Sequence, residues 1–239
     1  MLTKRYNAHG EPHHRDIRSG GARAAVFGIS DGLVTNVSLI LGVAGAHPGS
    51  SIVALTGVAG LVAGAFSMAA GEYVSMQAQR ELLERELEVE RQALRRSPAA
   101  ERRELAALYE RRGLAPELAR ELSEEMMRDP ETALETHARE ELGIDPASLG
   151  SPIVAAASSF VTFALGALLP LIPWLVGGGD SAIYASIGVG GGAAIGVGAG
   201  LGVLTGRSFV RSALRQLAVA ALAAAVTYGI GRAVGVSGA

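Results

Sequence analysis

Long apolar segments alternate with one strongly polar segment along this chain of 239 residues. Five of the apolar segments are each near the ~20 residues that a membrane-spanning helix needs. They cover residues 24–46, 52–78, 151–176, 182–205 and 212–236. Short loops rich in turn residues, HPGSS and GGGDS, join the first segment to the second and the third to the fourth. The pattern predicts an all-α polytopic membrane protein with five transmembrane helices.

The polar segment, residues 80–146, lies between the second and third apolar segments. Its first part continues out of the second apolar segment without a helix breaker, which predicts one long helix that projects from the membrane. Pro98, Gly113 and Gly143 are typical of helix starts and ends, so three shorter helices follow. The predicted organisation is a tail (1–23), transmembrane helices one and two (24–79), a helical insert (80–146) and transmembrane helices three to five (147–239).

The composition supports this picture. Hydrophobic residues make up 49% of the chain and charged residues 18%, against about 25% charged residues in ordinary soluble domains. The insert holds 18 of the 23 acidic and 12 of the 21 basic residues, so its charge is set apart from an otherwise apolar protein. The chain has no cysteine, which excludes disulfides, zinc–thiolate sites and iron–sulfur clusters.

Basic residues outside the insert predict the orientation, because short cytosolic loops are enriched in Lys and Arg. Five of them lie in the N-terminal tail and three near the loop between the fourth and fifth apolar segments, and the other two short loops have none. We therefore expect the tail and the insert in the cytosol and the C-terminus outside. The tail has no secretory apolar region, and a bacterial-style inner or plasma membrane and a vacuole-like membrane are equally compatible with the sequence.

Two carboxylates interrupt the predicted spans. Asp31 lies in the first apolar segment and Glu72 in the second, and neither segment contains Lys or Arg. An acid in a lipid-spanning helix costs at least ~2.5–3.5 kcal/mol, so it usually meets a partner or a polar pathway. Met68 shares a helix face with Glu72 at a spacing of four residues, and this set suits a divalent cation, or protons in its absence. The alternatives are gap-filling for the methionine, a capping or bending role for Asp31, and contact with cytosolic water for Glu72.

Glutamates of the insert are a second candidate site, because acids at the cytosolic end of such a pathway would concentrate cations. The alternative is a solvated helix face with salt bridges, since arginines are interleaved with the glutamates. His137 is expected on the surface. The sequence has no GxxxxGK[ST] motif for ATP binding, and GGGD at 177–180 falls in a predicted outside turn, where a protease site is not expected.

Two segments, GISDGLVTNVSLILGVAGA (28–46) and AGAFSMAAGEYVSMQAQRE (63–81), resemble the vacuolar iron transporter family. The similarity extends to ELAALYERRGL (104–114) in the insert and to the plan of five spans. The resemblance implies a homodimer with a cation path between the subunits near the first span. It also implies that Fe²⁺, often with Mn²⁺, is moved out of the cytosol in exchange for protons.

The resemblance also implies a set of metal ligands. In the spans they are Asp31, Met68 and Glu72, and in the insert they are Glu90, Glu101, Glu104, Met126, Met127 and Glu131, with Glu86 as an adjacent candidate. Where the family often has a further glutamate near position 93, this chain has Ala93, so the number of bound ions stays open.

We therefore predict a divalent metal transporter for Fe²⁺ or Mn²⁺ that is not an enzyme and needs no resident cofactor. The expected partners are metal ions, protons, the lipid bilayer and a second copy of the chain, with no nucleic acid. The alternative is a membrane-anchored scaffold whose charged cytosolic bundle binds a protein partner. That alternative explains the insert but not an uncompensated Asp31 within a span.

Overall fold

The computed structural model describes residues 20–143 and 150–237, and every secondary-structure element in these ranges is a helix. The helices are α1 (Gly20–Gly45), α2 (Ser50–Arg96), α3 (Pro98–Arg111), α4 (Pro116–Met126), α5 (Pro130–Glu140), α6 (Pro152–Val176), α7 (Gly179–Leu204) and α8 (Phe209–Ser237). The predicted all-α class is confirmed.

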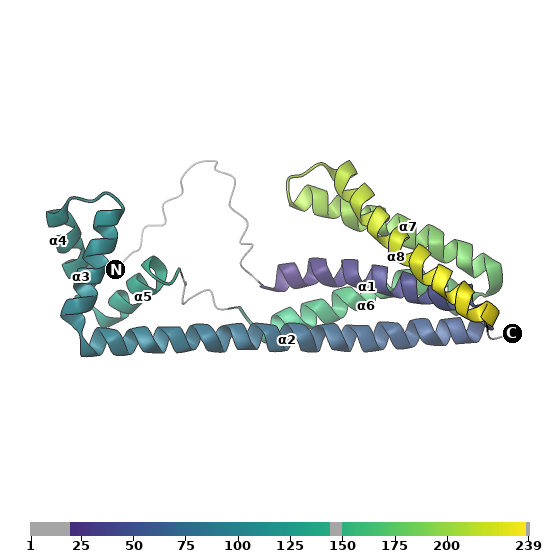
Figure 1. The fold of residues 1–239 in the computed structure, drawn as a ribbon, viewed down its shortest axis with the longest axis horizontal. Helices are drawn as coiled ribbons and strands as arrows, with labels where there is room; N and C mark the ends of the chain where they lie inside the picture. The colour runs from purple at the N-terminus through teal and green to yellow at the C-terminus, as the bar shows by residue number, and fades with distance from the viewer. Residues whose placement is uncertain (1–19, 144–149, 238–239) are drawn as a thin grey trace, which may run out of the picture.

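Helix α2 runs along the whole molecule and carries two separate groups of helices (Figure 1). Its N-terminal half packs with α1 and α6, which α7 and α8 join to complete one group, and its C-terminal end carries α3, α4 and α5. Its 47 residues extend for about 70 Å at 1.5 Å per residue. The hydrocarbon core of a bilayer is only about 30 Å thick, so roughly 40 Å of α2 projects beyond it as a rod.

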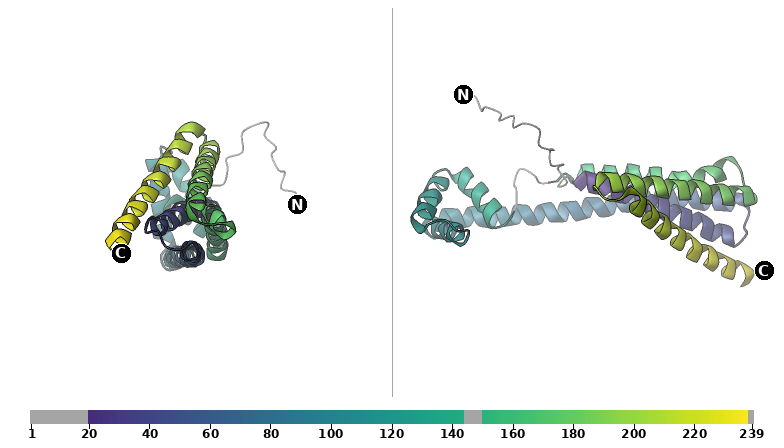
Figure 2. Two further views of the ribbon diagram at one scale, coloured as in Figure 1. Left: turned by 90° about the vertical axis from the view of Figure 1, so that its right-hand side faces the viewer. Right: turned by 90° about the horizontal axis from the view of Figure 1, so that it is seen from above.

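Five helices, α1, α2, α6, α7 and α8, are long and apolar enough to cross a membrane. Large apolar side chains such as Leu55, Phe66 and Leu222 are exposed on their outer faces, which is the arrangement expected where lipid replaces water. The chain is therefore a multi-pass membrane protein. In the end-on view, α1 lies between α8 and α6, with α2 on a third side (Figure 2).

Glycines bring α1 and α6 into close contact at the centre of this bundle. A Cβ atom at Gly28 or Gly32 of α1 would collide with α6 next to Phe163, and one at Gly166 of α6 would collide with the carbonyl of Ile29. Small residues let spanning helices approach until their backbones touch, which strengthens van der Waals packing where no hydrophobic effect is available. These glycines therefore fix the crossing of the two most buried spans.

Polar side chains join α1 to its neighbours inside the bundle. The Asn36 amide donates a hydrogen bond to the carbonyl of Ala167 on α6 at 2.6 Å, and the Thr227 hydroxyl of α8 donates to the carbonyl of Ser38 at 2.7 Å. Interhelical hydrogen bonds of this kind are typically worth about 0.6 kcal/mol in membranes. They hold α1 between α6 and α8 with a defined rotation, which decides where Asp31 points.

The insert consists of the projecting part of α2 with α3, α4 and α5. As predicted, α2 ends before Ser97 and α3 begins at Pro98, and Gly113 follows α3 with a positive φ of 98°. Asp129 caps α5, because its carboxylate accepts the backbone N–H of Thr132 at 2.8 Å. The apolar core of the insert joins α3 to α4 through Leu105, Leu108, Tyr109 and Ala119.

Candidate metal sites

Three ligand side chains converge in the insert where α5 packs on the projecting part of α2. One ligand atom each of Glu90 on α2, Glu101 on α3 and His137 on α5 lies within 4.8 Å of the other two. The His137 imidazole is fully buried, and its Nδ1 atom is 3.1 Å from Oε1 of Glu90 and 3.2 Å from Oε1 of Glu141. The cluster therefore extends to four side chains from three segments of the chain.

These close contacts do not have the geometry of hydrogen bonds. Oε1 of Glu90, both ring nitrogens of His137 and Oε1 of Glu141 are buried and make no hydrogen bond within the described residues. A buried polar atom without a partner costs about 1–3 kcal/mol. Carboxylate oxygens and an imidazole nitrogen are the donors that Fe²⁺, Mn²⁺ and Zn²⁺ accept in proteins. The donor set therefore fits a divalent transition-metal ion.

The electrostatics of the cluster favour a cation. Burial raises the pKa of the Glu90 carboxyl above its ordinary value, the nearby His137 opposes the rise, and Glu141, Glu101 and Glu104 add to it. Burial also raises the pKa of Glu141, and Glu104 and Glu101 add to the effect. Several carboxylates thus repel one another in a partly desolvated place. A dication between them would offset both the repulsion and the cost of desolvation.

The remaining predicted insert residues lie around this cluster or apart from it. Glu104 is exposed and acts on the cluster through its charge, and Glu86 is half-buried one turn before Glu90 on α2. Met126 and Met127 pack against the apolar core of α3 and α4, and the Met126 sulfur accepts a hydrogen bond from Thr136. Glu131 is exposed in the first turn of α5. The structure therefore brings together Glu90 and Glu101 of the predicted set.

The expectation that His137 lies on the surface is wrong. Helix α5 buries Ala133, Leu134, His137 and Ala138, so the histidine occupies a regular position on the apolar face of that helix. This i, i+1, i+4, i+5 pattern was present in the sequence and places His137 inside. Glu141 follows four residues after His137 on the same face. His137 and Glu141 are the members of the cluster that were not predicted as ligands from the sequence.

In the membrane bundle, Glu72 has a basic partner after all. Nη2 of Arg23 on α1 lies 2.9 Å from Oε1 of Glu72 on α2. The apolar pattern places Arg23 in the N-terminal tail, whereas α1 begins at Gly20 and includes it. The expectation that Glu72 lacks a cationic neighbour is therefore wrong, because the helix extends further than the apolar segment does.

Asp31 lies on a face of α1 that the single chain leaves open. Phe27 and Thr35, one turn before and after it, are exposed, and Asp31 itself is half-buried. The Thr35 hydroxyl donates a hydrogen bond to Oδ1 of Asp31 at 3.3 Å. Ala24 packs against Met76, one turn beyond Glu72 on the antiparallel α2. By this register Glu72 lies about one helical turn, ~5 Å, closer than Asp31 to the insert.

Met68 packs beside the core of Ala65, Phe163 and Ala167, at about the level of Asp31. Its thioether therefore has a structural role, because it packs α2 against α6. No hydrogen bond or ion pair joins Asp31 to Glu72 within the described residues. The candidate residues of the spans therefore lie at two levels along the bundle axis, and Glu72 is at the level nearer the insert.

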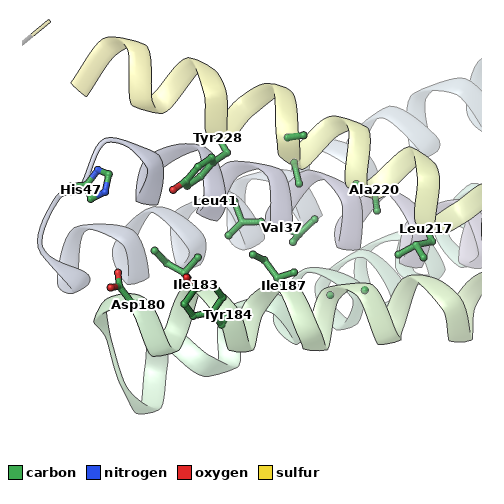
Figure 3. A pocket seen from close by; sticks show the side chains of 15 residues that line it. Val37, Leu41, His47, Asp180, Ile183, Tyr184, Ile187, Leu217, Ala220 and Tyr228 are labelled. Atoms are coloured by element: carbon green, nitrogen blue, oxygen red, sulfur yellow. The ribbon is translucent and has the colours of Figure 1, made fainter. Parts of the chain in front are cut away.

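A separate pocket of about 480 Å³ lies at the other end of the bundle between α1, α7 and α8 (Figure 3). His47 and Asp180 lie near its end, and the Tyr228 ring points into the space between the helices. The rest of the lining is mainly aliphatic, from residues such as Val37 and Ile187. An apolar lining does not suit a dication, so this pocket is not a candidate metal site.

Comparison with known proteins places this architecture in a family. The VIT family sequence model matches residues 22–232. Vacuolar iron transporter 1 of Oryza sativa subsp. japonica is 30% identical over 238 residues, covering 98% of this chain and 94% of the relative. The vacuolar iron transporter of Acanthamoeba castellanii is 35% identical over 227 residues, covering 93% and 82%. Vacuolar iron transporter 1 of Arabidopsis thaliana is 28% identical over 213 residues, covering 89% and 85%. This chain belongs to the VIT family.

Proposed function

We propose that the protein transports Fe²⁺, with Mn²⁺ as a second cargo, out of the cytosol in exchange for protons. The observation that carries the proposal is the convergence of four side chains, from Glu90, Glu101, His137 and Glu141. Several of their potential metal-binding atoms are buried and make no hydrogen bond. The relatives named vacuolar iron transporters support iron as the cargo. The concentration of Lys and Arg in the N-terminal segment and the α7–α8 loop supports a cytosolic position for the insert.

The cluster in the insert is the capture site. A dication there binds carboxylates that burial and mutual repulsion destabilise in its absence, and this lowers the concentration of metal needed for binding. From the insert the ion passes to Glu72 at the near end of the bundle. It then reaches Asp31 and Thr35, about one turn further along α1, with the Met68 sulfur as a softer ligand at the same level.

A second copy of the chain completes the path. Asp31 lies on an open face of α1, and a carboxylate that faces lipid costs at least ~2.5–3.5 kcal/mol. Pairing of this face with the same face of another copy would remove Asp31 from lipid and enclose a polar path between two α1 helices. The resemblance to the family supports the same arrangement. When a dication leaves Asp31, a proton is the cation that can replace it, which couples export to proton uptake.

Metal uptake into vesicles that contain the purified protein tests the proposal. We expect wild-type protein to move Fe²⁺ and Mn²⁺ and to respond to a pH gradient across the vesicle. Asp31→Ala should abolish uptake. Asp180→Ala removes an exposed carboxylate in the first turn of α7, away from the insert, and should leave uptake unchanged. Wild-type uptake by Asp31→Ala would exclude the proposed path.

The scaffold alternative predicts a different result. Exposed ion pairs such as Arg80–Glu84 and Arg91–Glu88 on α2 are compatible with a surface that binds a protein. They do not explain why two carboxylates and an imidazole are buried together around His137 without hydrogen bonds. If vesicles showed no uptake and a partner bound the insert without metal, the scaffold would replace the transporter.

A further inference from the structure

Among the described residues, Arg23 is the one basic side chain that reaches an acid of the spanning region. Its guanidinium, on α1, contacts the carboxylate of Glu72 on α2, which is 49 residues later in the sequence. The Glu72 side chain is only 13% exposed, whereas the Arg23 side chain is 69% exposed. The Arg23 side chain therefore lies between the largely buried Glu72 carboxylate and the exterior of the protein, at the end of the bundle that faces the insert.

The backbone that carries Arg23 is firmly held. The neighbouring Ala24 is buried against Met76 and Ala155. The Gly21 carbonyl accepts a hydrogen bond from the Ser158 hydroxyl of α6 at 2.9 Å. In the described residues the guanidinium itself has Glu72 as its ion-pair partner and no second one. The side chain can therefore swing away from Glu72 by rotation about its own bonds, while α1 stays in place.

We propose that the Arg23 guanidinium competes with divalent cations for the Glu72 carboxylate. It stays bound to this carboxylate until a divalent cation displaces it. This inference rests on the proposed transport function. Because one cation replaces another, the carboxylate at the entrance of the bundle is never left without a counter-charge, which would be costly at that depth. A monovalent ion gains no charge advantage over the guanidinium, whereas a dication does. Arg23 therefore determines specificity for dications at the first step in the membrane.

Replacement of the charge tests the proposal. In Arg23→Gln the shorter side chain keeps N–H donors, now on an amide, but loses the positive charge that competes for Glu72. We expect the KM for Mn²⁺ uptake to fall about twofold to fivefold, the range for a partly exposed ion pair, while kcat stays near the wild-type value. A high concentration of Na⁺ should inhibit Arg23→Gln and leave the wild type unaffected. A purely structural contact between α1 and α2 would predict neither change.

Three further variants separate this effect from others. Arg23→Lys keeps the charge and should retain a KM and Na⁺ tolerance near those of the wild type. In a Glu72→Gln background, Arg23→Gln should cause no further change. Arg80→Gln removes an arginine from an exposed pair with Glu84 on the same helix as Glu72 and serves as the matched control. An unchanged KM in Arg23→Gln, or equal changes in Arg23→Gln and Arg23→Lys, would overturn the proposal.

A measurement on the wild-type protein covers the case in which Arg23→Gln does not fold. Modification by an arginine-specific dicarbonyl reagent, followed by mass spectrometry, should become faster at Arg23 when Mn²⁺ is added and should not change at Arg80. A rate at Arg23 that does not respond to Mn²⁺ contradicts displacement. Wild-type vesicles that move metal without this response would retain the transport function and lose only the role of Arg23, whereas vesicles that move no metal would refute both.

Discussion

His137 is the residue at which the structure and the family resemblance make different predictions. The resemblance selects glutamates and methionines in the insert, whereas the structure places a buried imidazole between Glu90 and Glu141. We expect His137→Ala to weaken metal binding to the insert strongly. The substitution removes the only nitrogen donor of the cluster and leaves two carboxylates facing each other across the space.

The size of the effect follows from the ligand count. His137 supplies one of four converging side chains, and Nδ1 lies 3.1 and 3.2 Å from the two carboxylate oxygens. Loss of residues that merely orient a metal ligand typically costs 10–100-fold in affinity. Loss of a ligand itself should cost at least as much, so we expect a decrease of about tenfold or more, equivalent to about 1.4 kcal/mol or more.

Calorimetric titration of the full-length protein in detergent with Mn²⁺ measures this change. The Glu72→Gln background removes the first acid of the spans, so that the heat reports mainly on the insert. Glu135→Gln is the matched control, because Glu135 is exposed on the same helix as His137, lies outside the cluster and is not among the predicted ligands.

Two results would refute the reasoning. The first is an affinity of His137→Ala equal to that of Glu135→Gln. The second is a larger loss when Met126 and Met127 are both replaced by leucine than when His137 is replaced by alanine. The second result would show that the insert binds metal through a rearranged methionine set.

Three further predictions concern stability. Burial raises the pKa of Glu90, so this group should stabilise the folded metal-free protein as the pH falls through its raised pKa towards the ordinary carboxyl value; the rise in apparent Tm should be smaller in Glu90→Gln. Gly32→Ala places a Cβ against the Phe163 backbone and should cost about 1–3 kcal/mol by apparent Tm, whereas Gly196→Ala meets open space and should be neutral. Asp129→Ala removes the cap of α5 and should cost about 1 kcal/mol in denaturant unfolding; Asp129→Asn should restore most of it.

Local signals located the helices of this protein, although α1 begins at Gly20, before its apolar segment. Apolar segments of about 20 residues predict spans because lipid offers the backbone no hydrogen-bond partner, and a helix satisfies its own backbone. The break at Ser97, the start of α3 at Pro98 and the positive φ of Gly113 follow from properties of single residues. The presence of Asp31 within a span was equally visible, because an ionisable residue there is rare and costly.

The membership of the two candidate sites depended on tertiary packing. The helical repeat relates Glu90 to Glu86 within α2, but it does not determine which helix packs on α2 or at which height. The docking of α5 brings His137 and Glu141 to Glu90, and the antiparallel register of α1 and α2 brings Arg23 to Glu72.

The sequence by itself thus determined how many helices are long and apolar enough to cross the membrane, and that acids lie within them. Those properties depend on the free energy of each segment in lipid or water. Only the tertiary structure decided which charges meet, because such contacts depend on the relative rotation and height of helices far apart in the chain. Packing sets these through close glycine contacts such as that of Gly32 with Phe163, which no pattern within one helix can specify.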